Sequence, residues 1–146
     1  MTAALRSVWT ERPPPAAAVL LDLDPGTELL TVTAHPVAPG AVVIVVHGEV
    51  DLCTSRLLQE GLFAHLHHTT SQMIVDFTGV GFFEATGLTV LVTVRQAAVA
   101  AGIRLYVVAD TRPVLLPLTI TGLDRVFDIY PDPAHALRRP AGGPHG

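Results

Sequence analysis

The segment Met73–Gly87, with the sequence MIVDFTGVGFFEATG, decides the fold of this chain. Its first part, Met73–Phe77, is a short, mostly apolar run, which is typical of a strand buried on both faces of a sheet. The apolar stretch Leu88–Ala101 that follows is long enough for a helix and precedes Gly102, a natural C-terminal stop. The segment therefore predicts a strand, a tight loop and a helix that begins near Thr86.

Thr86 carries the only hydroxyl between Gly81 and Gly87, a loop in which Phe82 and Phe83 are predicted to turn the chain. Free backbone N–H groups and the helix dipole make the start of a helix receptive to negative charge. The hydroxyl is open to two interpretations, as a plain helix cap or as the acceptor of a phosphoryl group.

The remainder of the chain alternates between strand-like and helix-like segments. Two strand patterns come first, an edge-like segment at 28–35 and a β-branched run at 41–48. Further helices are expected at about 54–67, 112–121 and 131–138, and further strands at 103–108 and 126–130. This order predicts an α/β fold, with a mixed β-sheet of about four to five strands flanked by about four helices in a single domain.

The two ends of the chain differ from the middle in composition. Residues 1–27 include a run of three prolines and a run of three alanines, and are interpreted as a mostly disordered leader. Residues 28–138 are assigned to the folded domain, and the Pro/Gly-rich residues 139–146 to a flexible tail.

Composition excludes several classes of function. Charged residues make up 15% of the chain and the net charge is −4, which leaves no basic footprint for direct contact with nucleic acid. All nine basic residues are arginines, which excludes a P-loop lysine, a Schiff base and a lysine general base. The apolar runs fall far short of the ~20 residues that a membrane-spanning helix needs. No familiar cofactor or hydrolase signature is present, so no cofactor is expected.

Two further features are interpreted as structural. Cys53 is the only cysteine, which excludes an intrachain disulfide framework and a thiolate zinc cluster and fits a reducing cytoplasm. We expect its side chain to be a small buried apolar group. His65, His67 and His68 have no carboxylate among them and are interpreted as a solvated helix end rather than a metal site.

Acidic side chains follow two successive strands of the predicted sheet. Glu49 and Asp51 leave the second strand at its C-terminal end, and Glu84 and Thr86 follow the third strand. Ligand sites lie beyond the C-terminal ends of parallel strands, so these residues converge at one edge if the two strands are parallel neighbours. The alternative is that they are turn residues and caps with no further role.

Short motifs resemble those of a known family in the same order and spacing. They are VVHGEVD at 45–51, IVDFTGV at 74–80, EATGL at 84–88 and TGLD at 121–124. The family's counterparts are a strand ending in Gly-Glu-hydrophobic-Asp, a Val-Asp-Leu-Ser-x-Val strand, an Asp-Ser-Ser-Gly-Leu phosphorylation loop and a Thr-Gly-Leu-Asp after the third helix. Over Leu29 to about Leu137 the chain thus resembles a STAS domain, and specifically a bacterial anti-sigma factor antagonist. The resemblance implies a STAS-like mixed sheet.

The predicted phosphorylation loop departs from the family pattern. Glu84 stands in place of the family's aspartate, Ala85 in place of its first serine, and Thr86 in place of the second serine, which is the phosphate acceptor. The resemblance therefore implies phosphorylation at Thr86, whose β-branched side chain has a stiffer χ1 than serine. The partner-binding surface is expected to comprise Glu49, Asp51, Phe82, Phe83, Glu84, Ala85, Gly87 and Leu88.

The resemblance implies a non-enzymatic, cytoplasmic regulator of bacterial transcription that works by partner switching. In such families the unphosphorylated protein binds an anti-sigma factor and so releases a sigma factor. The anti-sigma factor is usually also a serine/threonine kinase of the histidine-kinase-like ATPase type, and phosphorylation reverses the binding. Contact with a membrane is not expected, and the sequence leaves open whether the chain forms a weak homodimer. The alternative is a ligand-sensing or accessory module that binds an anion or nucleotide without a phosphorylation switch.

Overall fold

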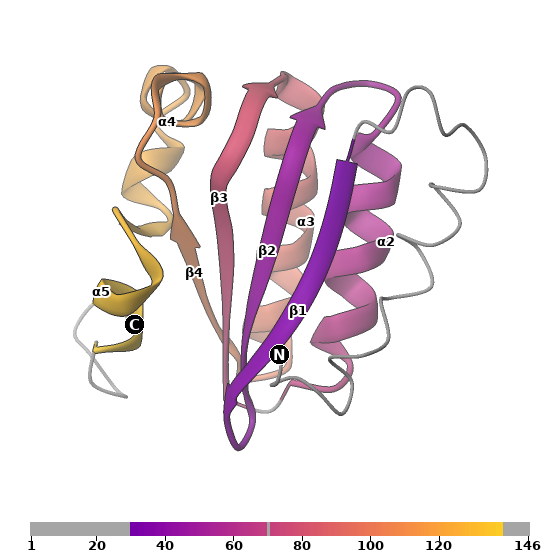
Figure 1. Cartoon of the computed structure of the whole chain (residues 1–146), viewed down its shortest axis with the longest axis vertical. Helices are drawn as coiled ribbons and strands as arrows, with labels where there is room; N and C mark the ends of the chain where they lie inside the picture. The colour runs from indigo at the N-terminus through magenta and orange to yellow at the C-terminus, as the bar shows by residue number, and fades with distance from the viewer. Residues whose placement is uncertain (1–29, 70, 139–146) are drawn as a thin grey trace.

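The computed structural model describes residues 30–69 and 71–138, whose strands form one five-stranded sheet (Figure 1). In chain order the elements are β1 (Leu30–Ala38), β2 (Ala41–Val50), α2 (Ser55–Leu66), β3 (Gln72–Phe83), α3 (Ala85–Ala100), β4 (Arg104–Val108), α4 (Arg112–Ile120), the 3-10 helix η3 (Leu123–Arg125), β5 (Asp128–Tyr130) and α5 (Pro133–Leu137). The strand order is β1-β2-β3-β4-β5, with β1 antiparallel to β2 and all other neighbours parallel. The predicted mixed sheet flanked by helices is therefore confirmed. The predictions for residues 1–27 and 139–146 lie outside the described residues.

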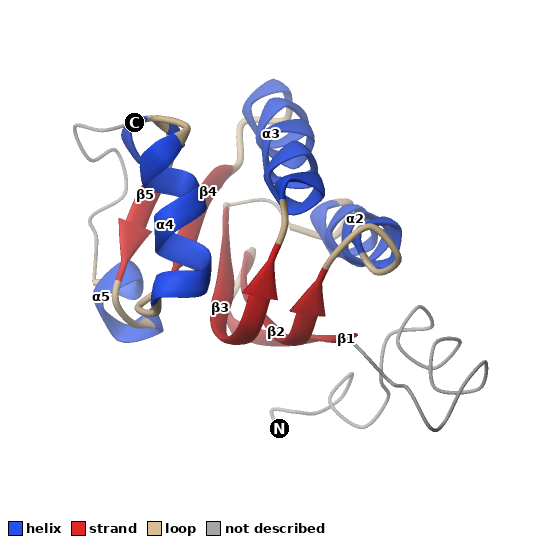
Figure 2. Ribbon diagram, turned by 90° about the horizontal axis from the view of Figure 1, so that it is seen from above, coloured by secondary structure: helices blue, strands red, loops and turns tan. Residues whose placement is uncertain are grey.

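The helices cover the two faces of the sheet unequally (Figure 2). Helices α2, α3 and α4 pack on one face, and the short α5 packs on the other. On β3, Met73, Val75 and Phe77 point into the large core beneath the helices, whereas Ile74 joins Ala136 of α5 on the opposite face. Side chains alternate between the faces of a strand, so a strand covered on both faces is a continuous apolar run.

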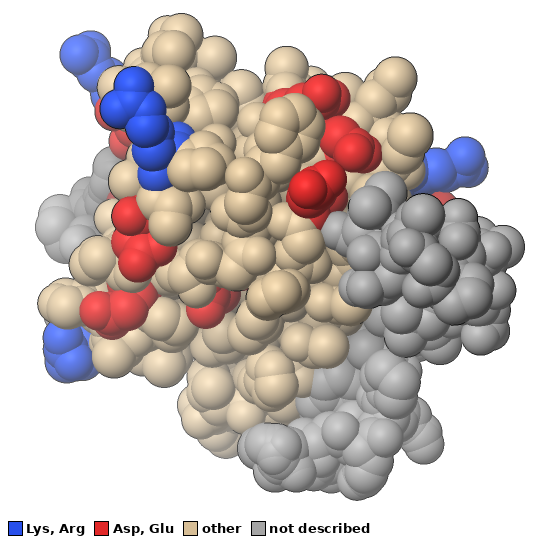
Figure 3. Space-filling view, turned by 45° about the horizontal axis from the view of Figure 1, so that its top comes forward, with Lys and Arg blue, Asp and Glu red and all other residues tan. Residues whose placement is uncertain are grey.

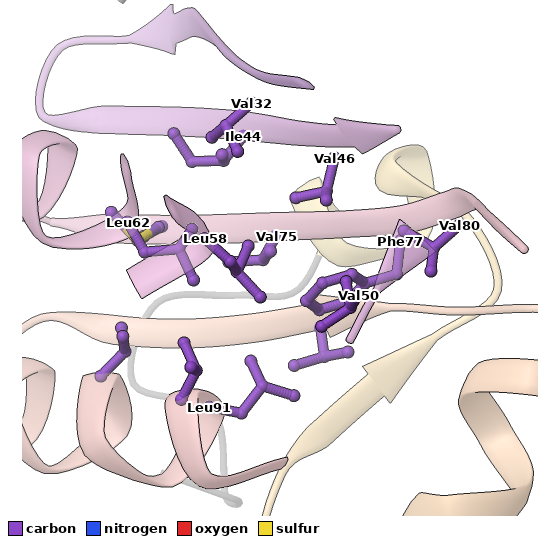
Figure 4. Packing of buried hydrophobic residues seen from close by; sticks show 14 of the residues in the cluster. Val32, Ile44, Val46, Val50, Leu58, Leu62, Val75, Phe77, Val80 and Leu91 are labelled. Carbon is purple, nitrogen blue, oxygen red and sulfur yellow. The ribbon is translucent and has the colours of Figure 1, made fainter. Parts of the chain in front are cut away.

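The main core packs α2 and α3 against the strands along most of their length (Figure 4). Val46 of β2 and Val75 of β3 share this core with Leu58 and Leu62 of α2 and Leu91 of α3, and all five side chains have no exposed surface. Apolar burial stabilises by roughly 25 cal/mol per Å² removed from water. It therefore fixes where the two helices begin relative to the ends of the strands.

Strand β3 is longer than predicted. We expected it to end at Phe77, with Phe82 and Phe83 in a turn. Instead the strand continues to Phe83 by pairing in parallel with the C-terminal half of β2, across two register irregularities. A Cβ atom on Gly79 would lie 2.6 Å from a ring carbon of His47 on β2, so this glycine allows a close approach rather than a turn.

Gly87 sets the position of the first turn of α3. A Cβ atom there would lie 2.7 Å from Cγ1 of Val50 and 2.8 Å from Cζ of Phe83, and both of these side chains belong to the core. Only glycine lets the backbone of α3 approach the ends of β2 and β3 this closely. No helix in the described part of the chain is both long enough and apolar enough to cross a membrane.

Candidate functional site

The C-terminal ends of β2 and β3 meet the N-terminal ends of α2 and α3 at one edge of the sheet. The backbone N–H of Glu84 donates to the carbonyl of Val50 at 2.8 Å, and the backbone N–H of Leu52 donates to Oε1 of Glu84 at 3.2 Å. Glu49 lies opposite Phe82 in the parallel pairing of the two strands. The structure therefore brings the acidic residues that follow both strands together, and acidic side chains group at this end of the molecule in Figure 3.

Asp51 organises the turn from β2 into α2. Its Oδ1 accepts backbone hydrogen bonds from Cys53 and Thr54, each of 2.9 Å, and its own N–H donates to Oγ1 of Thr54 at 2.9 Å. The buried Thr54 hydroxyl in turn donates to the carbonyl of Glu49 at 2.7 Å. Asp51 thus has the structural role that the sequence left open as an alternative. The exposed Glu49 side chain has no such role.

Two large apolar side chains are exposed at this edge. Leu52 is 74% exposed and Phe82 is 46% exposed. The backbone N–H of Leu52 is bonded to Glu84, and Phe82 lies two residues before Glu84 on β3. The sequence reasoning missed Leu52, although a leucine in a turn, outside the apolar stripe of the following helix, was an available signal. The two residues place an apolar surface beside acidic groups, as protein interfaces often do.

Some residues predicted for the partner-binding surface lie in the core instead. Phe83 is 6% exposed and packs edge-to-face on Phe77 with ring centroids 5.4 Å apart, and Leu88 is 7% exposed. Gly87 is also buried, against Val50 and Phe83. We correct the prediction for these residues: they belong to the core that supports this edge and contribute little to its exposed surface. Phe83 faces inward because β3 continues through it, so that it and Phe82 point to opposite sides of the strand.

Thr86 is the second residue of α3, after Ala85, and does not cap the helix. The N-cap position is Glu84, and no side chain makes a capping hydrogen bond there. Thr86 is partly buried as a residue, but its Oγ1 atom has less than 1 Å² of exposed surface and no hydrogen-bond partner. The interpretation of Thr86 as a plain helix cap is therefore wrong, and its hydroxyl is covered in the unmodified protein.

A cavity of about 280 Å³ lies beside Thr86, between the first turns of α2 and α3. It is lined by Ser55, Arg56, Gln59, Thr86, Thr89 and Val90. Most of these side chains are polar, and Arg56 adds a positive charge. The described ion pair of Arg56 is with Glu60, one turn along α2, at 3.4 Å. The cavity therefore places one cation, Arg56, beside Thr86 among otherwise uncharged side chains.

The other candidates from the sequence have structural explanations. Cys53 is exposed, which makes the prediction of a buried thiol wrong, because the residue lies in the turn before α2. His67 and His68 are exposed at the end of α2 as predicted, but His65 is partly buried. Burial, together with the nearby His68, lowers the pKa of His65 to about 4. No cluster of three or more metal-ligating side chains occurs among residues 30–69 and 71–138.

The chain is similar to known proteins both in sequence and in fold. Residues 33–136 match the family model described as the STAS domain. The anti-sigma-F factor antagonist RsfB of Mycobacterium tuberculosis is 26% identical over 119 residues, which span 82% of this chain and 94% of RsfB. An anti-sigma factor antagonist from Mycobacterium paratuberculosis has a TM-score of 0.68 at 26% identity, over 75% of this chain and 92% of that structure. Phosphorylated SpoIIAA of Bacillus shares the fold, with a TM-score of 0.58 at 16% identity, over 75% and 98% of the two chains.

Proposed function

The chain belongs to the STAS domain family, and on that premise we propose that it is an anti-sigma factor antagonist. The similarity to RsfB along most of both chains supports this role. The structural observation that carries the proposal is the edge where Leu52 and Phe82 are exposed beside Glu84. Protein interfaces usually have aromatic side chains at the centre, which lose water on binding, and polar or charged side chains at the rim.

The partner of this edge is an anti-sigma factor, and binding it releases a sigma factor for transcription. The chain itself acts by binding and performs no catalysis. We propose further that the anti-sigma factor is a kinase of the histidine-kinase-like ATPase type, and that it phosphorylates Thr86. In that step Oγ1 of Thr86 forms a bond to the γ-phosphorus of ATP, the bond from that phosphorus to ADP breaks, and the hydroxyl proton leaves to solvent.

Phosphorylation at Thr86 ends partner binding through charge. A phosphoryl group adds about −1.5 to −2 charges at neutral pH. These charges are added within the same edge as Glu84 and Glu49, where the covering partner surface removes water. Unmatched charge across an interface costs several kcal/mol. Because Oγ1 of Thr86 is covered in the unmodified protein, the side chain must rotate about χ1 before transfer, and we expect phosphorylation to be slow.

The test combines complex formation with intact-mass analysis. The full chain is incubated with purified candidate anti-sigma factors, first without ATP and then with it. The proposal predicts a complex without ATP, then a mass increase of one phosphoryl group and loss of the complex. Thr86→Ala is the matched control, which forms the complex but gains no mass. Absence of a complex with any histidine-kinase-like anti-sigma factor of the same organism would contradict the proposal.

A second function, sensing of a free anion, is favoured by the cavity beside Thr86 and Arg56. In this case the chain is a ligand-driven module without a kinase. A rise in melting temperature with inorganic phosphate or a nucleotide, in the absence of any kinase, would support it.

A further inference from the structure

We infer that Arg56 is the receptor for the phosphoryl group of Thr86, and that the Arg56–phosphothreonine pair ties the start of α2 to the start of α3. The inference rests on the proposed phosphorylation of Thr86 and adds the residue that holds the modified state. Arg56 and Thr86 are each the second residue of their helix and line the same cavity of about 280 Å³.

The guanidinium of Arg56 is free to change partners at little cost. Its ion pair with Glu60 has an N–O distance of 3.4 Å, and the two side chains are 87% and 57% exposed. Exposed pairs of this kind contribute little to stability, since water screens them. A dianionic phosphate is a stronger partner than a carboxylate one turn away, because it carries about −1.5 to −2 charges rather than −1 and also accepts two parallel hydrogen bonds from the fork of an arginine.

The surroundings of Thr86 direct its phosphoryl group toward α2. Before α3 lies Glu84, the N-cap residue two positions ahead of Thr86, and its carboxylate repels a phosphate. On the helix side lie Arg56 and the polar side chains of the cavity, and the first turns of both helices present partial positive charge there. Oγ1 of Thr86 lacks a hydrogen-bond partner, so no existing bond holds the side chain against this change.

The pairing has a consequence for the exposed edge. Helix α2 begins directly after the turn that carries Leu52, and Leu52 is bonded to Glu84 just before α3. A link between Arg56 and the phosphoryl group holds the starts of α2 and α3 together and restrains the turn that carries Leu52. The modified protein therefore differs from the unmodified one in the geometry of its apolar edge as well as in charge.

The test installs phosphothreonine at position 86 of the full chain by chemical ligation, so that no kinase is needed. The second pKa of the phosphate is read by ³¹P NMR during a pH titration. A nearby cation lowers the pKa of an acid by about one unit or more. We expect Arg56→Gln to raise the phosphate pKa by about one unit, Arg56→Lys to restore part of the shift, and Arg95→Gln, on α3 but outside the cavity lining, to leave it unchanged. An unchanged phosphate pKa in Arg56→Gln would overturn the inference.

Two further measurements test whether a change in the phosphate pKa comes from misfolding and whether the cavity binds a free anion. The melting temperature of unphosphorylated Arg56→Gln is expected to equal that of the wild type, since the residue is exposed, which shows that the pKa change is not caused by misfolding. Inorganic phosphate added to the unphosphorylated wild type is expected to leave the Arg56 Nε signal unshifted. A saturable shift would overturn the inference in favour of a free anion in the cavity. Failure of every kinase to modify Thr86 would contradict the proposed function alone, because the phosphoryl group is installed chemically here.

Discussion

The backbone N–H of Leu52 and the carboxylate of Glu84 form a hydrogen bond of 3.2 Å between segments 32 residues apart in the chain. It joins the turn before α2 to the residue before α3, so that both helix starts and the exposed Leu52 side chain form one unit. Thr86, the proposed site of phosphorylation, lies two residues after Glu84, which accepts this bond. We expect a change at the start of α3 to reach the apolar surface around Leu52 through this bond.

Thr86→Val is expected to leave the fold intact and to raise the free energy of unfolding by up to about 1 kcal/mol. Valine keeps the shape of threonine and removes a buried hydroxyl that has no hydrogen-bond partner, which costs about 1–3 kcal/mol to bury. Urea unfolding checks this, with Thr89→Val on the exposed side of α3 as the control, expected within about 0.5 kcal/mol of wild type. A loss of about 1 kcal/mol in Thr86→Val would instead indicate a capping role.

Thr86→Glu is expected to weaken binding of the anti-sigma factor at least 100-fold, which corresponds to about 2.7 kcal/mol. The added carboxylate places negative charge inside the covered edge without a matching partner. Calorimetry measures the affinity, and Gln96→Glu, exposed further along α3, is the control with the same added charge. Equal affinities for Thr86→Glu and wild type would show that the switch lies elsewhere.

Leu52→Ser combined with Phe82→Ser is expected to abolish partner binding while the protein stays folded. Leu52 is 74% exposed and loses little packing, whereas Phe82 is 46% exposed and its replacement lowers the free energy of unfolding by about 1 kcal/mol. The matched control is Val99→Ser, which is 61% exposed at the far end of α3. If the double variant binds as tightly as Val99→Ser, this edge is not the interface.

Asp51→Ala is expected to destabilise the protein by about 1–2 kcal/mol, because two backbone N–H groups lose the carboxylate oxygen that accepts from them. This replaces the simple expectation for an exposed turn residue, a change below ~0.5 kcal/mol, which still holds for Glu49→Ala. Urea unfolding of both variants measures the difference. Equal stability of the two would show that the Asp51 turn holds without its side chain.

Stability is expected to fall as the pH decreases from about 6.5 to about 4 because of His65. Its pKa is lowered to about 4 in the folded protein, so the unfolded chain binds more protons in this window. The contribution is fully present above pH 6.5 and is lost toward pH 4, with a slope of at most about 1.4 kcal/mol per pH unit and less where solvent reaches the ring. His65→Gln should remove this slope in urea unfolding, and His67→Gln, at the exposed end of α2, should retain it.

The order and type of the elements could be predicted because they depend on local patterns. The apolar run at Met73–Phe77, the stripe of α2 and the glycine after α3 each identify an element without reference to the rest of the chain. The motifs near Glu49 and Thr86 indicated the family for the same reason. The convergence of the two acidic segments followed from the parallel order of their strands.

Other features depended on neighbours that are distant in sequence. The end of β3 could not be predicted because its last residues, to Phe83, are held by pairing with β2. Phe83 faces inward because β3 continues through it. Cys53 is exposed because it lies in the turn between β2 and α2. Pattern reasoning could not supply these contacts, since they form only when the sheet assembles.

The amino-acid sequence by itself determined the mixed sheet, its flanking helices and the family to which the chain belongs, because periodicity and turn chemistry act over a few residues. Only the tertiary structure decided the environment of Thr86. Its hydroxyl is covered, and the residue borders a cavity that Arg56 also lines, because Gly87 lets α3 approach the strand ends while α2 packs alongside. That environment is created by packing between helices whose first turns are some 30 residues apart in the chain, and no local pattern encodes it.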